Sequence, residues 1–244
     1  MKKSINVLFI ILSIMLLSGC SAAGEQTGFF FDVFVRPMTW SIHELGTFFG
    51  DSYGMAIVAI TILIRLLLMP LMMKSYKSQR ATKNRMKQVQ PQLDALKAQA
   101  ETAKTPEEQK KIQMEMMEIY KQNKLFNIGC LPTLIQMPIL MGLYFAIRTL
   151  PDTGNQMFLW FNLGTPDLII TILAGGVYFV QARAPIADMA GTQKQQMQIM
   201  AYLSPLMIIL FSFSAPAVFP LYWAVGGLFL IVQTWLSRKL YKEE

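Results

Sequence analysis

Stretches of roughly twenty apolar residues recur along this chain, and that is the length needed to cross the hydrocarbon core of a bilayer. Five of them are predicted to be transmembrane helices, at residues 54–73, 129–148, 167–184, 197–214 and 218–236. Of the 244 residues, 53% are hydrophobic and only 15% are charged, a composition typical of integral membrane proteins. The sequence therefore predicts an all-α integral membrane protein with five transmembrane helices in a single membrane domain.

The first twenty residues have the pattern of an export signal. Lys2 and Lys3 precede an apolar run over residues 5–17, and the sequence Leu-Ser-Gly-Cys ends at Cys20. These four residues resemble a bacterial lipobox, where cleavage leaves the cysteine as a lipidated N-terminus. We expect a lipoprotein signal peptide at residues 1–19 and a lipid such as palmitate on Cys20. The alternative is an uncleaved first spanning helix, although the run is short for a span.

Residues 20–53 are expected to hold this lipidated N-terminus and an amphipathic helix. Within residues 32–50, apolar side chains recur at helical spacing with polar ones between them. The apolar set is Phe34, Met38, Ile42, Leu45 and Phe49. The pattern predicts an interfacial helix on the extracytoplasmic face of the membrane, with the only histidine, His43, on its solvated side. The only other cysteine, Cys130, is expected to be a packing residue, because one remaining thiol supports no disulfide framework.

Basic residues are distributed unevenly between the connections of the predicted spans. Residues 74–124 contain twelve Lys and Arg against six Asp and Glu, whereas residues 149–166 contain no Lys or Arg. Further basic residues on the same predicted side as the first segment are Arg183, Lys194, Arg238, Lys239 and Lys242. Because cytoplasmic connections carry the excess of Lys and Arg, we expect a bacterial plasma membrane protein with its N-terminus outside and its C-terminus in the cytoplasm.

The basic segment at residues 75–124 is predicted to be a cytoplasmic helical hairpin. Two apolar stripes step by three and four residues along it, separated by a break near residues 101–105. Thr105, Pro106 and Glu108 form the pattern of a capping box at the start of the second helix. Candidate partners for its basic surface are anionic lipids, the ribosome or targeting machinery, although a positive loop is also a plain consequence of topology. The segment contains no motif for recognition of a specific nucleic-acid sequence.

The chain lacks the residues that common catalytic sites require. One histidine and one cysteine beyond Cys20 are too few for a zinc or iron site of the usual kinds. There is no GxxxxGK[ST] loop for nucleotide and no evident Ser, His and Asp triad. We therefore expect no enzyme activity, no cofactor and no metal.

Single polar side chains interrupt four of the five apolar spans. They are Arg65, Gln136, Gln181 and Gln233, the last of these followed by Trp235. A charge at the centre of a spanning helix costs roughly 2.5 to 3.5 kcal/mol on insertion scales, so a use for Arg65 is expected. Arg65 lies eight residues before Met73, about 12 Å from the predicted cytoplasmic end of its helix.

The glutamines also fall in the cytoplasmic half of their predicted spans, so these residues predict a hydrophilic groove that is open to the cytoplasm and closed above. Such a groove would hold an unpaired cation ready for an acidic or polar segment. The alternative is structural: Arg65 snorkels to the inner headgroups, and the glutamines join helices by hydrogen bonds.

Four segments of the chain resemble the YidC/Oxa/Alb family of membrane protein insertases. They are YGMAIVAITILIRLLLMPL (53–71), GCLPTLIQMPILMGLYFAI (129–147), FLWFNLG (158–164) and LYWAVGGLFLIVQTWL (221–236). Together with the lipobox, they are similar to the Gram-positive lipoprotein type of this family. The resemblance implies a five-helix insertase core at residues 54–236, a groove arginine at Arg65, and polar groove neighbours at Gln136, Gln181, Gln233 and Trp235.

The implied function is an insertase and chaperone that receives nascent membrane proteins, alone or beside the Sec translocon, and releases them into the lipid bilayer. The basic tail at residues 237–244 is short, so ribosome binding through a long C-terminal extension, as in some relatives, is not implied. Two other classes remain open: a small anion transporter that uses Arg65, and a structural assembly subunit. Transporters usually show internal repeats and broken helices, and neither pattern is evident here.

Overall fold

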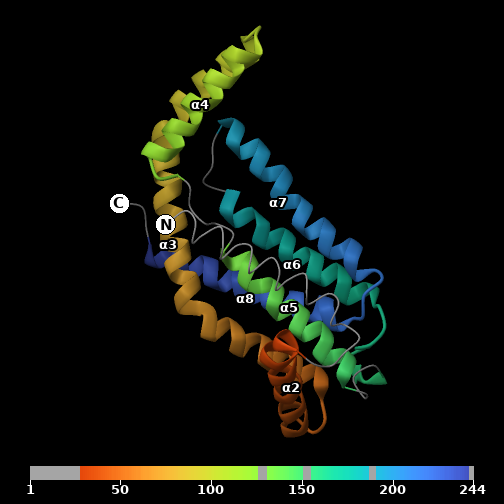
Figure 1. The fold of residues 1–244 in the computed structure, drawn as a ribbon. Helices are drawn as coiled ribbons and strands as arrows, with labels where there is room; N and C mark the ends of the chain where they lie inside the picture. Colours follow the sequence, from red (N-terminus) through yellow and green to blue (C-terminus); the bar gives the residue numbers. More distant parts are fainter. Residues whose placement is uncertain (1–27, 126–130, 151–154, 187–190, 242–244) are drawn as a thin grey trace. The chain divides into compact units, whose positions relative to one another are not determined.

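The computed structural model describes residues 28–125, 131–150, 155–186 and 191–241 (Figure 1). Its elements are the π-helical turn η1 (Phe31–Val35), α2 (Arg36–Phe48), α3 (Tyr53–Thr102), α4 (Pro106–Gln122), α5 (Leu131–Thr149), β1 (Met157–Phe158), β2 (Phe161–Asn162), α6 (Leu168–Ile186), α7 (Gly191–Ser212) and α8 (Val218–Leu240). The expected signal peptide, Cys20 and Cys130 lie outside the described residues.

Each predicted span corresponds to a helix, but several boundaries differ. α3 runs for 50 residues and includes Pro70 and Pro91, so the chain does not break where the first span was predicted to end at residue 73. α7 begins before the predicted residue 197, within a polar stretch. Within the described residues, α3 and α8 are long and apolar enough to cross a membrane, and Leu168–Ala184 and Ala201–Ser212 are shorter apolar helices.

The chain divides into two compact units. The first combines Met1–Leu63 with Ile135–Leu228, and the second combines Ile64–Leu134 with Phe229–Glu244. α3 and α8 therefore each contribute residues to both units. In the first unit, α6 and α7 lie side by side (Figure 1). Small residues allow close helix contacts here, because a Cβ at Gly175 would overlap Ile209 and one at Gly227 would meet Val177.

A short antiparallel β-hairpin interrupts the otherwise helical fold of the first unit. Met157 pairs with Asn162 and Phe158 with Phe161, and Leu159 at the turn has a φ of 56°. The all-α prediction missed this hairpin, because its turn contains none of the Gly, Asn or Asp residues that usually indicate one. The connection after it accepts hydrogen bonds from the start of α8, at the amides of Ala217 and Val218.

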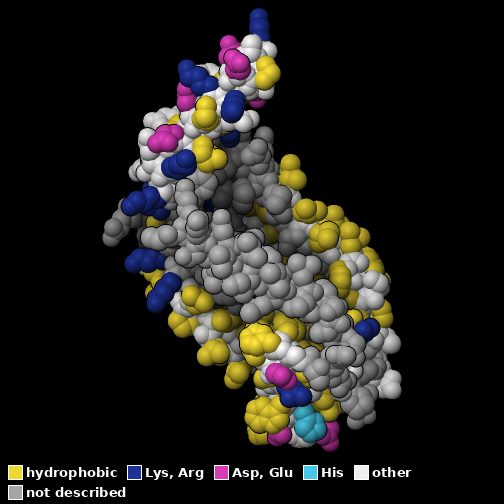
Figure 2. Space-filling model, in the orientation of Figure 1, with side chains coloured by type: hydrophobic (Ala, Val, Ile, Leu, Met, Phe, Trp, Pro, Cys, Tyr) yellow, Lys and Arg dark blue, Asp and Glu magenta, His cyan; other side chains and the backbone are white. Residues whose placement is uncertain are grey.

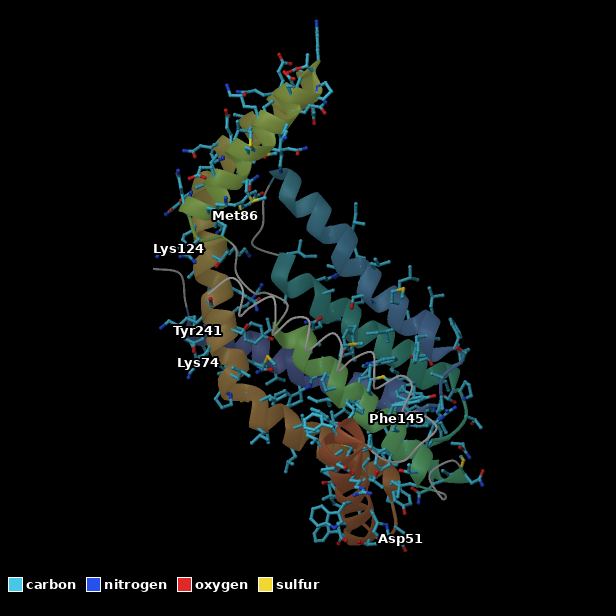
Figure 3. All side chains as sticks on the ribbon, viewed as in Figure 1. Asp51, Lys74, Met86, Lys124, Phe145 and Tyr241 are labelled. Carbon is cyan, nitrogen blue, oxygen red and sulfur yellow. The ribbon has the colours of Figure 1, made fainter. Side chains whose placement is uncertain are left out.

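The same loop holds the beginning of α3. The side-chain amide of Gln156 accepts a hydrogen bond from the Tyr53 amide at 2.6 Å and donates to the carbonyl of Asp51, which Figure 3 labels. The Phe158 ring lies against Gly54 so closely that a Cβ there would overlap it. Residues 155–167 thus join the N-terminal ends of α3 and α8 within one unit.

The hairpin formed by the later part of α3 and by α4 belongs to the second unit. Val89, Leu93 and Leu125 form its buried core, and the partly buried residues packed against them are Met86, Met116, Ile119 and Tyr120. The predicted capping box is present: Thr105 Oγ1 accepts from the Glu108 amide at 3.2 Å, and the Glu108 carboxylate accepts from the Thr105 amide. Lys and Arg side chains remain on the outside of this hairpin (Figure 2).

The amphipathic segment differs from its prediction in which apolar stripe is covered. Ile42 and Val35 are fully buried, and Phe34 contacts Gly142 of α5, so part of the predicted lipid-facing stripe packs on protein. A second apolar stripe is exposed instead. It consists of Phe29, Val33, Trp40 and Phe48. The segment therefore has two apolar faces, one against the first unit and one uncovered by the described residues.

Candidate intramembrane polar site

The five predicted groove residues are divided between the two units. Gln136 on α5 and Gln181 on α6 belong to the first unit, whereas Arg65 on α3 and Gln233 with Trp235 on α8 belong to the second. Their meeting in one groove therefore stays a prediction. The surroundings of each residue within its own unit are described below.

Arg65 is half-buried on α3, within the most apolar part of the helix. Its neighbours Leu66 and Leu67 are exposed apolar side chains. Among the residues that the structure describes, none forms an ion pair or a hydrogen bond with the Arg65 guanidinium. Five N–H donors are thus held in apolar surroundings, where a carboxylate or carbonyl oxygen would satisfy them.

Gln233 and Trp235 have opposite environments although they are two residues apart. Gln233 is only 2% exposed, and its Nε2 has no hydrogen-bond partner among the described residues. A buried amide of this kind costs free energy until it is paired. Trp235 is exposed, with the Lys239 ammonium 5.5 Å from its ring centroid. Gln233 therefore has a hydrogen-bond donor without a described partner, and Trp235 has an exposed aromatic ring.

Contacts inside the second unit show which part of α3 lies beside Gln233 and Trp235 of α8. Thr234 donates a hydrogen bond to the Tyr76 hydroxyl at 3.5 Å, and the Lys77 ammonium lies 5.9 Å from the Tyr241 ring. Tyr76 follows Arg65 by eleven residues on one helix, or about 16 Å. The polar part of α8 therefore lies closer to the hairpin than Arg65 does.

Gln136 already has a partner within the first unit. Its Nε2 donates to the Tyr222 hydroxyl of α8 at 2.6 Å, which joins α5 to α8. This contact supports the structural alternative for Gln136, in which an amide links two helices. Gln181 is half-buried on α6 and has no hydrogen bond to another described residue.

Two tyrosines belong to these polar contacts and were not singled out from the sequence. Tyr222 and Tyr76 each present a hydroxyl to a partner on another helix. Tyr222 lies within an apolar run, where a phenol counts as a hydrophobic residue in a composition scan, and Tyr76 lies in the basic segment that follows the first predicted span. The signal in the sequence is a glutamine or threonine within an apolar helix, because a buried polar side chain there needs a hydrogen-bond partner on another helix, and a tyrosine hydroxyl can supply it. Within the described residues, no group of His, Cys, Asp and Glu could hold a metal ion.

Comparison with known proteins finds extensive similarity. Residues 44–244 match the family described as the 60Kd inner membrane protein. The chain is 43% identical to the membrane protein insertase YidC 2 of Listeria monocytogenes over 245 residues, covering 98% of this chain and 89% of that one. It is 40% identical to the insertase YidC of Staphylococcus carnosus, covering 100% and 88%, and 36% identical to the insertase MisCB of Bacillus subtilis, covering 86% and 80%.

A solved structure shares the fold. The crystal structure described as an active YidC insertase with its first transmembrane domain resolved aligns with a TM-score of 0.60 at 23% identity. The alignment covers 89% of this chain and 48% of the solved one, so this chain spans about half of that protein's length. At this identity, the likeness concerns the arrangement of the helices.

Proposed function

This chain belongs to the 60Kd inner membrane protein family, together with the YidC membrane protein insertases, and on that premise we propose that it is a membrane protein insertase and chaperone. Its clients are nascent membrane proteins, which it receives from the cytoplasm and releases into the bilayer. The observation that carries this proposal is Arg65, a half-buried cation in an apolar helix with no partner among the described residues. A residue so costly in a membrane is kept for a visiting group.

The physical task of an insertase is to move a polar flank through hydrocarbon. A groove that reaches partway across from the cytoplasm shortens the apolar path of that flank. The Arg65 guanidinium attracts an acidic side chain or a backbone carbonyl during this step. The apolar segment of the client then leaves between helices into lipid, and the burial of its surface there drives the reaction without nucleotide hydrolysis.

The predicted groove consists of Arg65, Gln136, Gln181, Gln233 and Trp235. Two observations support the assignment of the α8 residues: the Gln233 Nε2 has no partner among the described residues, and the Trp235 ring is exposed. Gln136 has a different role in this proposal, because its amide is bonded to Tyr222 and so fixes α5 against α8. The groove thus uses Arg65 and Gln233 as donors and Trp235 as an apolar contact.

We further propose the membrane arrangement that the charge distribution predicts. The chain has five spans, a lipid-anchored N-terminus at Cys20 outside the plasma membrane, and its C-terminus in the cytoplasm. The basic hairpin of α3 and α4 then lies in the cytoplasm, where anionic lipids, the ribosome and the Sec translocon are available as partners. Support comes from its twelve Lys and Arg over residues 74–124.

Reconstitution in liposomes tests the proposed function directly. Purified protein is incorporated without Sec components, and a single-span client with a short acidic flank is added without nucleotide. We expect protease protection of the translocated flank only in liposomes that contain the protein. Failure of such clients to insert, together with flux of small anions through the same liposomes, would indicate a transporter instead.

A further inference from the structure

An open cavity of about 370 Å³ lies between η1, α2 and the end of α5, and none of the predicted groove residues lines it. All of its lining residues belong to the first unit. They are Phe31, Arg36, Thr39, Trp40, His43, Thr149 and Leu150. The volume falls within the range of small-ligand sites, and the walls combine aromatic and aliphatic surface with a few polar groups, as such sites usually do.

Three polar side chains of the cavity lie on one face of α2. Arg36, Thr39 and His43 are spaced by three and four residues, so they lie above one another on the helix. The Arg36 guanidinium forms an ion pair with Asp32 at 3.0 Å, but both side chains are at least half exposed. An exposed pair of this kind contributes little, and one carboxylate does not use all five guanidinium N–H groups. Arg36 therefore retains donors for a second anion.

The acceptors of the cavity are two threonine hydroxyls. Thr39 Oγ1 donates to the Val35 carbonyl at 2.9 Å, and Thr149 Oγ1 donates to the Ala146 carbonyl at 2.8 Å. The two oxygens lie 3.3 Å apart. Thr39 and Thr149 are within hydrogen-bond distance of each other, and either hydroxyl can be the donor. Because a hydroxyl oxygen has two lone pairs, each oxygen keeps at least one lone pair for a ligand. A molecule that fits the cavity thus carries an anion for Arg36 and His43 and hydroxyl groups for the two threonines.

The exposed stripe of the same helix points to where this ligand comes from. Phe29, Val33, Trp40 and Phe48 are uncovered by the described residues, and Trp40 also lines the cavity. Aromatic and aliphatic side chains on one face, with charged groups at its flank, suit a helix at the boundary between acyl chains and headgroups. A lipid beside Trp40 would present its headgroup to Arg36 and His43.

We propose that this cavity binds the headgroup of an anionic phospholipid that carries hydroxyl groups. The phosphodiester oxygens accept hydrogen bonds from Arg36 and His43, and headgroup hydroxyls donate to Thr39 and Thr149. The acyl chains pass along Trp40 and the exposed stripe. This inference rests on the proposed function only in that it takes α2 to lie at the membrane surface.

Lipid retention on the purified full-length protein in detergent tests the site without any client. The probe is dioctanoyl phosphatidylglycerol, and retention is measured by native mass spectrometry. Dioctanoyl glycerol lacks the phosphate, and glycerol phosphate lacks the acyl chains. Dioctanoyl phosphatidylcholine lacks both the headgroup hydroxyls and the net negative charge. We expect phosphatidylglycerol to be retained most strongly of the four.

Variants separate the two halves of the site. Arg36→Gln should weaken retention of both phospholipids on the order of tenfold, the effect of losing one charge-assisted contact. Thr39→Val should weaken phosphatidylglycerol alone, toward the level of phosphatidylcholine. Arg148→Gln is the matched control, because Arg148 is an exposed arginine next to Thr149 that does not line the cavity. Its retention should stay within twofold of the parent chain.

Several results would overturn the assignment. Equal losses in Arg36→Gln and Arg148→Gln would mean general charge attraction, and equal retention of dioctanoyl glycerol would mean an acyl-chain site without headgroup recognition. Tight binding of glycerol phosphate alone would mean a site for soluble phosphates. If Arg36→Gln does not fold, His43→Gln at an exposed position tests the same contact, and it should also weaken retention of phosphatidylglycerol. Since no client is present, loss of insertase activity in liposomes would leave these measurements unaffected.

Discussion

Gln156 accepts a hydrogen bond from the backbone amide of Tyr53 at 2.6 Å, and its own Nε2 donates to the carbonyl of Asp51. One side chain from the β-hairpin loop thereby satisfies both sides of the turn that starts α3. Asp51 has a φ of 63°, a conformation that Asp tolerates better than most residues but that still gains from an external partner. The start of the helix that carries Arg65 is therefore fixed by a residue about a hundred positions later.

Gln156→Ala should destabilise the protein by about 1–2 kcal/mol, because the Tyr53 amide and the Asp51 carbonyl lose their partner. Gln156→Glu should destabilise at least as much, since it directs a carboxylate at the Asp51 carbonyl. Thermal unfolding in detergent measures both. Asn155→Ala changes the exposed neighbouring residue and should leave the melting temperature within experimental error. An unchanged melting temperature in Gln156→Ala would mean that water replaces the amide.

Gly54→Ala should destabilise by about 1–3 kcal/mol, because the added Cβ would overlap the Phe158 ring and force the hairpin away from α3. Combining it with Phe158→Ala should recover part of the loss, which a double-mutant cycle in thermal unfolding measures. Gly176→Ala is the control, since its Cβ would meet nothing within 4 Å. That variant should be neutral or slightly stabilising, because alanine favours helix over glycine. Equal effects in both variants would contradict the role of Phe158.

Arg65→Ala should lower the insertion of clients with acidic flanks about tenfold or more, the effect of one lost charge-assisted hydrogen bond. Its melting temperature should stay close to that of the parent chain, because no described residue depends on the guanidinium for a partner. Arg65→Lys keeps the charge and should be milder. Insertion into liposomes and thermal unfolding provide the two measurements.

Clients with uncharged flanks provide the matched control for Arg65→Ala, and their insertion should fall less. If both Arg65 variants fail to fold, the arginine has the structural role that snorkelling or helix joining would give it.

Leu93→Ala should loosen the hairpin of α3 and α4, because Leu93 is only 1% exposed in its core. Large-to-small changes at such positions cost about 2–5 kcal/mol. Hydrogen exchange should then speed up in α4 while α6 keeps its protection. Met114→Ala removes a methionine exposed on α4 and should change exchange little. Slow exchange of α4 in Leu93→Ala would show that the hairpin is held by other contacts.

Thr105→Ala should fray the start of α4, since it removes the acceptor of the Glu108 amide and costs about 1 kcal/mol. Thr105→Ser keeps the hydroxyl and should retain most of the stability. Exchange rates of the amides at residues 107–109 give the readout. Identical rates in the two variants would mean that the Glu108 side chain alone maintains the cap.

Local signals in the sequence predicted local structure well. The Thr105 capping box could be predicted because its partners are three residues apart, and its hydrogen bonds are present. The break between α3 and α4 near residues 101–105 is also confirmed. The hairpin at Phe158 and Phe161 was missed, because its turn places Leu159 at a positive φ without the usual turn residues. Contacts outside the turn, such as the Phe158 ring on Gly54, stabilise it instead.

The periodicity of the sequence could not predict which side chains pack against distant parts of the chain. The stripe containing Ile42 and the stripe containing Trp40 are both apolar, and lipid and protein are equally good surroundings for such side chains. Only the fold shows that Ile42 is buried while Trp40 remains exposed. The Gln136 amide likewise could be assigned to a groove or to a helix contact until its bond to Tyr222, 86 residues later, was seen.

Under the proposed function, Pro70 of α3 changes what a client segment would meet beside Arg65. Pro70 has no backbone N–H, so the Leu66 carbonyl lacks the donor that an ordinary residue four positions later would supply. The helix therefore presents a backbone acceptor one residue after the guanidinium donors, in its most apolar stretch. A client peptide group has both a carbonyl and an N–H that need hydrogen-bond partners. The Arg65 guanidinium would donate to the carbonyl, and the Leu66 carbonyl would accept from the N–H.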